Sequence, residues 1–164
     1  MKGNGEMDYR SFLQQKTDYG IEDGFDPLWM PEFLFDFQRL LTDLNIRKGR
    51  FATFADCGMG KTRIQLEWAR SVRPPNRAVL IVAPLAVAEQ TQAEAAEMGL
   101  DVVRVTAPSD APFKITNYQR LHHFVKAPYA GLVLDESSIL KSFDGAYRNQ
   151  ITEFSKKMRY RLLA

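Results

Sequence analysis

The sequence of 164 residues contains one cysteine, Cys57, and only two histidines, His122 and His123. A single cysteine excludes an internal disulfide and any metal site built from a cysteine cluster. The two histidines are adjacent and have no cysteine or carboxylate cluster near them in the sequence, so we expect them to be structural or surface residues. The sequence therefore indicates neither a disulfide framework nor a cysteine or histidine metal site.

Long apolar runs are also absent. No run approaches the ~20 residues needed to cross a membrane, and the opening MKGNGEMDYR has no apolar segment of the kind found in secretion signals. With 45% hydrophobic and 26% charged residues, the chain has the composition of one globular domain of ordinary size. We therefore expect a cytoplasmic protein with no membrane partner.

Charge is divided unevenly along the chain. Residues 1–36 carry 3 basic and 8 acidic side chains, a net charge of −5, whereas residues 37–164 carry 19 basic and 12 acidic side chains, a net charge of +7. A basic body of this kind can attract a phosphate backbone. Ordinary solvated surfaces look similar, so charge alone does not establish a nucleic-acid partner.

The stretch FATFADCGMGKT, from Phe51 to Thr62, has the pattern of a strand, a glycine-containing loop and the start of a helix. Its glycines allow successive backbone N–H groups to turn inward around phosphate oxygens. Lys61 adds a positive charge for the β- and γ-phosphates, Thr62 a hydroxyl ligand for Mg²⁺, and the helix N-terminus its dipole. The common signature begins with glycine where this chain has Ala55, so the match is to a variant. The residues expected to bind the nucleotide here are Cys57, Gly58, Met59, Gly60, Lys61, Thr62 and Arg63.

A second motif, GLVLDESS, follows further along the chain. The apolar run from Ala130 to Leu134 predicts a buried parallel strand that ends at two adjacent carboxylates, Asp135 and Glu136. Ligands of open α/β sheets bind at the carboxyl ends of the strands. We expect Asp135 to hold Mg²⁺ together with Thr62, and Glu136 to orient and deprotonate the attacking water. The expected catalytic residues are then Lys61, Asp135 and Glu136.

Strand and helix patterns alternate through the rest of the chain. Residues 1–30 show no sustained period, and we interpret them as an irregular leader that packs over the domain. A helix is expected to begin at Pro31, with an apolar stripe made of Phe33, Phe37, Leu40 and Leu44. Further strands are expected at 78–83, 101–106, 113–116 and 160–164, and helices at 63–72, 86–98, 118–125 and 146–157. This alternation predicts an α/β fold, a three-layer P-loop NTPase domain whose mainly parallel sheet is covered by helices on both faces.

The order of these motifs resembles the first RecA-like domain of superfamily 2 helicases and translocases, in particular the Swi/Snf-like branch, related to DEAD/DEAH-box proteins, and its phage and prophage relatives. Residues 55–62 match motif I of that superfamily, A-x-x-G-x-G-K-T, at every fixed position. LFDFQRLL, residues 34–41, is similar to the Q-motif, which implies that Gln38 reads the adenine edge. DESSILK, residues 135–141, is similar to motif II, but Ser138 replaces the histidine of DEAH-type members.

Two further segments resemble the nucleic-acid contacts of that family. VAPLAVAEQT, residues 82–91, is similar to motif Ia, although Thr91 departs from the tryptophan usual in chromatin-remodelling members, and ITNYQ, residues 115–119, is similar to motif Ib. In the family these segments offer helix ends and backbone N–H groups to the phosphates of one strand. The resemblance implies nucleic-acid contacts from Pro84, Leu85, Asn117 and Tyr118.

The resemblance covers residues 31–164, from the Q-motif to the start of motif III, and implies a RecA-like domain that uses ATP and Mg²⁺. It implies a DNA-dependent ATPase that moves on nucleic acid through phosphate contacts, in a bacterial or phage-infected host cell, and the choice between DNA and RNA stays open. The arginine fingers of such enzymes come from a second RecA-like domain, absent from this chain, so the fragment is expected to hydrolyse ATP poorly. Two alternatives stay open: a phage DNA-packaging motor ATPase, and a non-catalytic module that binds nucleotide or a protein partner. The oligomeric state is not indicated.

Overall fold

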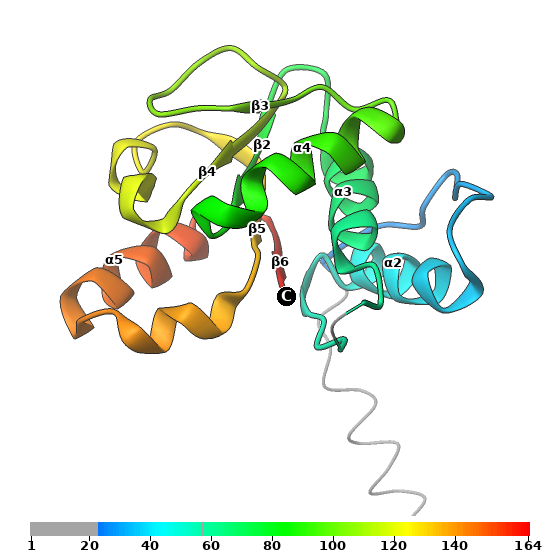
Figure 1. The fold of residues 1–164 in the computed structure, drawn as a ribbon, viewed down its shortest axis with the longest axis horizontal. Coiled ribbons are helices and arrows are strands. Elements are labelled where there is room, and N and C mark those ends of the chain that lie inside the picture. The colour runs from blue at the N-terminus through cyan, green and yellow to red at the C-terminus, as the bar shows by residue number, and fades with distance from the viewer. Residues whose placement is uncertain (1–22, 57) are drawn as a thin grey trace, which may run out of the picture.

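The computed structural model of the protein describes residues 23–56 and 58–164. Its centre is a sheet of six strands in the order β1-β6-β5-β2-β4-β3 (Figure 1). The strands are β1 (Arg50–Ala52), β2 (Ala78–Val82), β3 (Val102–Arg104), β4 (Phe113–Thr116), β5 (Tyr129–Leu134) and β6 (Tyr160–Leu163). Every pairing is parallel, so the sheet that was predicted to be mainly parallel is parallel throughout.

Helices cover both faces of this sheet. They are α2 (Asp36–Lys48), α3 (Lys61–Val72), η1 (Leu85–Val87), α4 (Ala88–Glu97), η2 (Tyr118–His123), η3 (Ser137–Ser142) and α5 (Gly145–Lys156). Successive side chains of β2 point to opposite faces of the sheet. Ile81 belongs to one apolar cluster with Trp68 of α3, and Leu80 belongs to another with Phe154 of α5. The three-layer α/β prediction is confirmed, with α3 and α4 against one face and η2 and α5 against the other.

The first helix differs from its prediction in both its start and its buried face. α2 begins at Asp36 and not at Pro31, since the side chain of Gln38 accepts a hydrogen bond from the backbone N–H of Phe35 and caps the helix there. The predicted apolar stripe is wrong, because Phe33, Phe37 and Leu40 are exposed and Leu44 is only half-buried. The side chains that α2 buries are Gln38, Thr42, Asn45 and Ile46.

Polar contacts explain why α2 buries this face. The indole Nε1 of Trp68 donates to the backbone carbonyl of Asn45 at 3.2 Å, and the Thr53 hydroxyl donates to Asn45 Oδ1 at 2.9 Å. Both partners are themselves buried, so a helix rotated to bury the phenylalanines would leave their polar groups without hydrogen bonds.

The segment 23–30 of the predicted leader lies against the domain. Gly24 and Phe25 donate backbone hydrogen bonds to the last turn of α2, and Asp23 pairs with Arg50 at 3.2 Å. The ring of Phe25 meets Tyr160 of β6 edge-on, with 5.8 Å between the ring centroids. The remainder of the leader, residues 1–22, lies outside the described residues.

Smaller differences concern element ends. The helix predicted at 86–98 is a short 3-10 turn, η1, followed by α4, and the helix predicted at 118–125 is the 3-10 helix η2. η3 has no counterpart in the sequence prediction. Among the described residues, no helix is long and apolar enough to cross a membrane.

Candidate active site

Three neighbouring strands bring the two predicted motifs together. β1 leads into the loop before α3, β5 leads into Asp135, and β6 lies between them and ends beside Ala164. Backbone hydrogen bonds join these ends, from Thr53 N to the Leu163 carbonyl and from Ala164 N to the Leu134 carbonyl. The result is a cleft of about 540 Å³ at the carboxyl edge of the sheet, lined by Gly58, Lys61, Thr62, Gln90, Asp135 and Glu136, among others.

The loop before α3 has the backbone geometry of an anion cradle. Gly58 and Gly60 have φ values of 80° and 68°, which glycine adopts at little cost. Gly60 is the N-cap of α3 and contributes no side-chain cap, so the first N–H groups of that helix are left to an anion. A Cβ at residue 60 would lie 2.3 Å from Nε2 of Gln38, so a side chain there would displace the Gln38 amide.

Gln38 lies beneath this loop. It is only 3% exposed, its Oε1 accepts from the Phe35 N–H at 3.1 Å, and its Nε2 donates to the Met59 carbonyl at 3.1 Å. Gln38 therefore ties α2 to the phosphate loop. Its contact with adenine stays a prediction.

Loss of the Gln38 amide should loosen the phosphate loop as well as any adenine contact. We expect Gln38→Ala to lower the free energy of unfolding by about 1–3 kcal/mol, because the Met59 carbonyl and the Phe35 N–H lose their partner. Thermal or urea unfolding measures this, and titration with ATP and GTP measures nucleotide affinity. Weaker ATP binding with unchanged GTP binding would support adenine reading. Equal weakening of both would assign Gln38 to loop support alone.

Asp135 is held by a residue that the sequence reasoning missed. Nε2 of Gln65, a buried side chain of α3, donates to Asp135 Oδ1 at 2.7 Å. Gln65 is one helical turn after Lys61, and this i, i+4 spacing places both on the same face of α3. That spacing was the available signal. The hydrogen bond fixes one carboxylate oxygen and leaves Oδ2 for another ligand.

Glu136 has an unusual backbone conformation. Its φ of 52° and ψ of 48° make it the one non-glycine with positive φ among the described residues. Such a conformation costs of order 1–3 kcal/mol, and strain of this kind concentrates at functional sites. The residue is exposed and lines the cleft beside Asp135.

Tyr118, predicted to contact nucleic acid, has a different place. Its ring is 1% exposed, and its hydroxyl donates to the backbone carbonyl of Asp135 at 2.7 Å. Burial, with the charges of Asp135 and Glu136, raises the pKa of Tyr118 above its usual value. Its side chain is therefore unavailable to a nucleic acid, and only its backbone could make the predicted contact. The hydroxyl instead links the η2 segment directly to the acidic motif.

Leu85 and Asn117, also predicted to contact nucleic acid, line one small pocket of about 110 Å³ at the ends of β2 and β4. Leu85 is 54% exposed, and the Asn117 side chain caps η2 by accepting from Arg120 N at 3.0 Å. Pro84 is the N-cap of η1 in the preceding turn. The structure thus brings the segments of Leu85 and Asn117 together. Val87 and Gln90, which follow Leu85 in the chain, line the cleft of the candidate active site.

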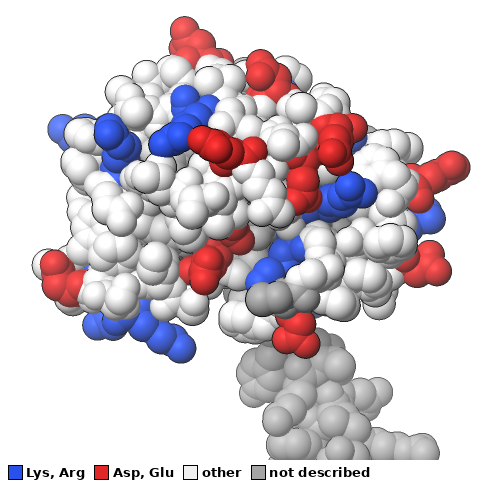
Figure 2. Space-filling model, viewed as in Figure 1, with Lys and Arg blue, Asp and Glu red and all other residues white. Residues whose placement is uncertain are grey.

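Three described residues predicted to bind the nucleotide, Met59, Gly60 and Arg63, do not line the cleft. The guanidinium of Arg63 pairs with Glu97 at 3.3 Å and with Glu94 at 4.0 Å, both on α4. Only its backbone stays next to the loop, bonded to the Gly60 carbonyl. Acidic and basic side chains are interspersed on the face shown in Figure 2, which suits such pairing. Cys57 lies outside the described residues.

The donor set suits Mg²⁺ bound together with a phosphate. Among the described residues no three His, Cys, Asp or Glu side chains converge to form a group that could hold a metal ion. Mg²⁺ is often held by one or two protein oxygens, with phosphate and water completing an octahedron. Thr62 and Asp135 line the same cleft and can supply those protein oxygens.

Comparisons with known proteins show the fold. No family model and no curated protein matches the sequence. Similar solved structures include one of T4 UvsW, with a TM-score of 0.64 and 15% identity, and one of the UvsW helicase from bacteriophage T4, with a TM-score of 0.59 and 16% identity. Each alignment covers 96% of this chain, but only 34% and 60% of those two chains. At these identities the likeness establishes a shared fold.

Proposed function

We propose that this chain is the first, ATP-binding domain of a DNA-dependent ATPase of the helicase or translocase type. The observation that carries the proposal is the cleft, in which an anion cradle, Lys61 and Thr62 face an adjacent pair of carboxylates across the end of β6. The fold shared with UvsW helicase is consistent with this function.

Each residue has a separate role in this proposal. Backbone N–H groups of the loop and Lys61 hold the β- and γ-phosphates, while Asp135, oriented by Gln65, provides an oxygen beside Thr62. Mg²⁺, when bound with the nucleotide, neutralises charge on the phosphate oxygens. Glu136 accepts the proton of the attacking water. Positioning and charge neutralisation dominate this chemistry, and an arginine from a second domain would add ~10³–10⁵ in rate.

Two other functions compete with this one. A DNA-packaging motor could use the same loop and carboxylates, and a scaffold could bind nucleotide without turnover. The packing of α2 beneath the loop through Gln38 favours the helicase type, because it places the Q-motif helix against the phosphate site.

DNA dependence of turnover separates these functions. We expect this chain to bind Mg·ADP in calorimetry and to hydrolyse ATP slowly, and a natural chain that includes a second domain to hydrolyse it faster when bare DNA is added. DNA binding should be insensitive to sequence and fall steeply with salt, since phosphate contacts dominate. Turnover that ignores DNA would contradict the helicase or translocase assignment, and absence of turnover with intact binding would favour the scaffold.

A further inference from the structure

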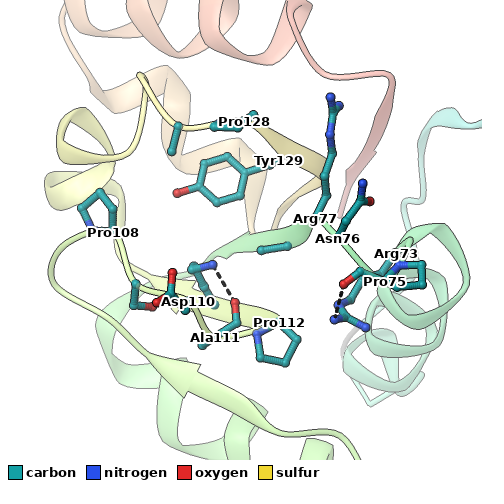
Figure 3. Close-up of a pocket in the computed structure, with 14 residues that line it drawn as sticks. Arg73, Pro75, Asn76, Arg77, Pro108, Asp110, Ala111, Pro112, Pro128 and Tyr129 are labelled. Carbon is teal, nitrogen blue, oxygen red and sulfur yellow. Dashed lines mark hydrogen bonds between the residues drawn. The ribbon is translucent and has the colours of Figure 1, made fainter.

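A groove follows the amino ends of the strands, on the edge of the sheet opposite the candidate active site. One part of it, a pocket of about 380 Å³, lies at the start of β2, β4 and β5 (Figure 3). A second part, of about 560 Å³, lies at the start of β2, β5 and β6. The two parts share Arg73, Asn76, Arg77 and Tyr129. Because the strand order is β6-β5-β2-β4, they form one continuous amino-edge groove across four neighbouring strands.

The amino-edge groove is strongly basic. Its cationic lining residues are Arg73, Arg77, Lys114, Lys157 and Arg159. Asp110 is the single carboxylate that lines it, and none of the five cations forms an ion pair with a carboxylate among the described residues. Arg73 donates instead to the Pro75 carbonyl at 3.4 Å, and Lys114 Nζ to the Ala111 carbonyl at 2.6 Å. The positive charge of the groove is therefore largely unneutralised.

Two buried polar groups form the floor of the groove. Lys114 is 4% exposed and Tyr129 is 5% exposed, and Lys114 Nζ lies 5.8 Å from the centre of the Tyr129 ring. The Tyr129 hydroxyl has no hydrogen-bond partner among the described residues. Burial raises the pKa of Tyr129 to about 12, so the hydroxyl is a donor at neutral pH. Burial also lowers the pKa of Lys114, and the charge of Arg73 lowers it further against the opposing effect of Asp110.

Helix dipoles explain only part of this arrangement. Arg73 and Lys157 directly follow the last residues of α3 and α5, where a cation complements the helix C-terminus. Lys114 is the second residue of β4, and Tyr129 begins β5, so neither is at a helix end. An anion bound in the groove would relieve the repulsion between Lys114 and Arg73.

We propose that the amino-edge groove binds the phosphate backbone of a nucleic acid. Successive phosphates lie along the exposed side chains of Arg77, Lys157 and Arg159, and the positive charge of Lys114 in the floor adds to their attraction. The spread of cations over four strands favours a chain of phosphates above a single small anion. The inference extends the proposed function and rests on its nucleic-acid partner, but it adds a contact surface remote from Leu85 and Asn117.

Charge reversal at the rim tests the groove. Arg77 and Arg159 are exposed, so the double variant Arg77→Glu/Arg159→Glu should fold as the parent does. A matched control, Arg39→Glu/Arg148→Glu, changes the net charge equally at exposed helix positions away from the groove. Binding of a fluorescein-labelled oligothymidylate of about 16 nucleotides is followed by anisotropy over a range of salt concentrations. We expect the groove variant to bind at least about tenfold more weakly and its salt slope to fall by about 1.4, for two lost single-strand phosphate contacts.

The Tyr129→Phe variant is a second control, which changes the floor without changing charge. We expect it to leave oligothymidylate binding close to that of the parent while the melting temperature of the free protein does not fall, because the hydroxyl is buried and has no partner among the described residues to lose. Equal weakening by the groove and control pairs would overturn the proposal, as would a parent chain that does not bind the oligonucleotide. Inorganic phosphate that stabilises the chain while the oligonucleotide does not bind would assign the pocket to a small anion and also overturn it. Calorimetry measures the Mg·ADP affinity of the same variants and so tests the active site separately. Loss of oligonucleotide binding with intact Mg·ADP affinity concerns the groove, whereas a parent chain that does not bind Mg·ADP contradicts the proposed function.

Discussion

Replacing Lys61 with alanine is expected to remove most of the affinity for Mg·ATP and Mg·ADP. Lys61 is the first residue of α3, lines the cleft, and makes no hydrogen bond or ion pair to another described residue that would hold it elsewhere. A hydrogen bond to a charged phosphate contributes about 1.5–3 kcal/mol, so the dissociation constant should rise ~10- to 150-fold. Isothermal titration calorimetry with Mg·ADP measures the change.

The same absence of partners makes Lys61→Ala a clean test. The melting temperature of the free protein should stay close to that of the parent, because no side-chain hydrogen bond or ion pair of Lys61 with the described residues is lost. Lys126→Ala, at an exposed position outside the cleft, is the matched control and should leave both affinity and stability unchanged. If the Lys61 variant binds ADP as tightly as the parent, the nucleotide does not occupy this loop and the proposed function fails with it.

The sequence was sufficient for the parts of the site that depend on local geometry. The phosphate loop needs glycines at positions of positive φ. The sequence pattern predicted Gly58 and Gly60 for these positions, and both residues have positive φ in the structure. The apolar run before Asp135 likewise predicts β5, because a strand that is buried on both faces is apolar at every position. Alternation of such strands with helices is enough to predict a parallel sheet.

What the sequence did not reveal depends on contacts between distant residues. The buried face of α2 is decided by hydrogen bonds from Trp68 and Thr53 to Asn45, and no period in residues 36–48 encodes them. The links from Gln65 and Tyr118 to Asp135 join residues 70 and 17 positions apart in the chain. Periodicity reports how a segment divides between core and solvent, and it contains no information on which polar partner a buried group will find.

The hydroxyl of Tyr118 connects the segment proposed to contact nucleic acid with the proposed active site. Tyr118 follows Asn117 of the proposed nucleic-acid segment and bonds the backbone of Asp135. A movement of η2 would therefore shift the backbone of Asp135 through this hydrogen bond.

The substitutions Asp135→Asn and Glu136→Gln should fail in different ways. Gln65 Nε2 requires an acceptor at Asp135 Oδ1, and asparagine can keep its oxygen there while its amide N–H₂ replaces Oδ2. An N–H₂ group cannot ligate Mg²⁺, so Asp135→Asn should lose about tenfold or more of the Mg²⁺-dependent part of ATP affinity. The measurement is ATP binding with and without Mg²⁺, and the fold should be retained because the hydrogen bond to Gln65 persists.

Glu136→Gln keeps the shape, the left-handed backbone and its strain, and removes only the basic oxygen that would take a proton from water. Nucleotide affinity should therefore stay within about threefold of the parent, while DNA-stimulated hydrolysis in a chain that includes the second domain should fall ~10²–10⁴-fold. ATP should then remain intact on the enzyme, which chromatography of the bound nucleotide after one incubation detects. Hydrolysis by Glu136→Gln at the parental rate would show that the general base lies elsewhere. In that case the strained conformation at residue 136 would need a different explanation, since the active site would no longer use its carboxylate.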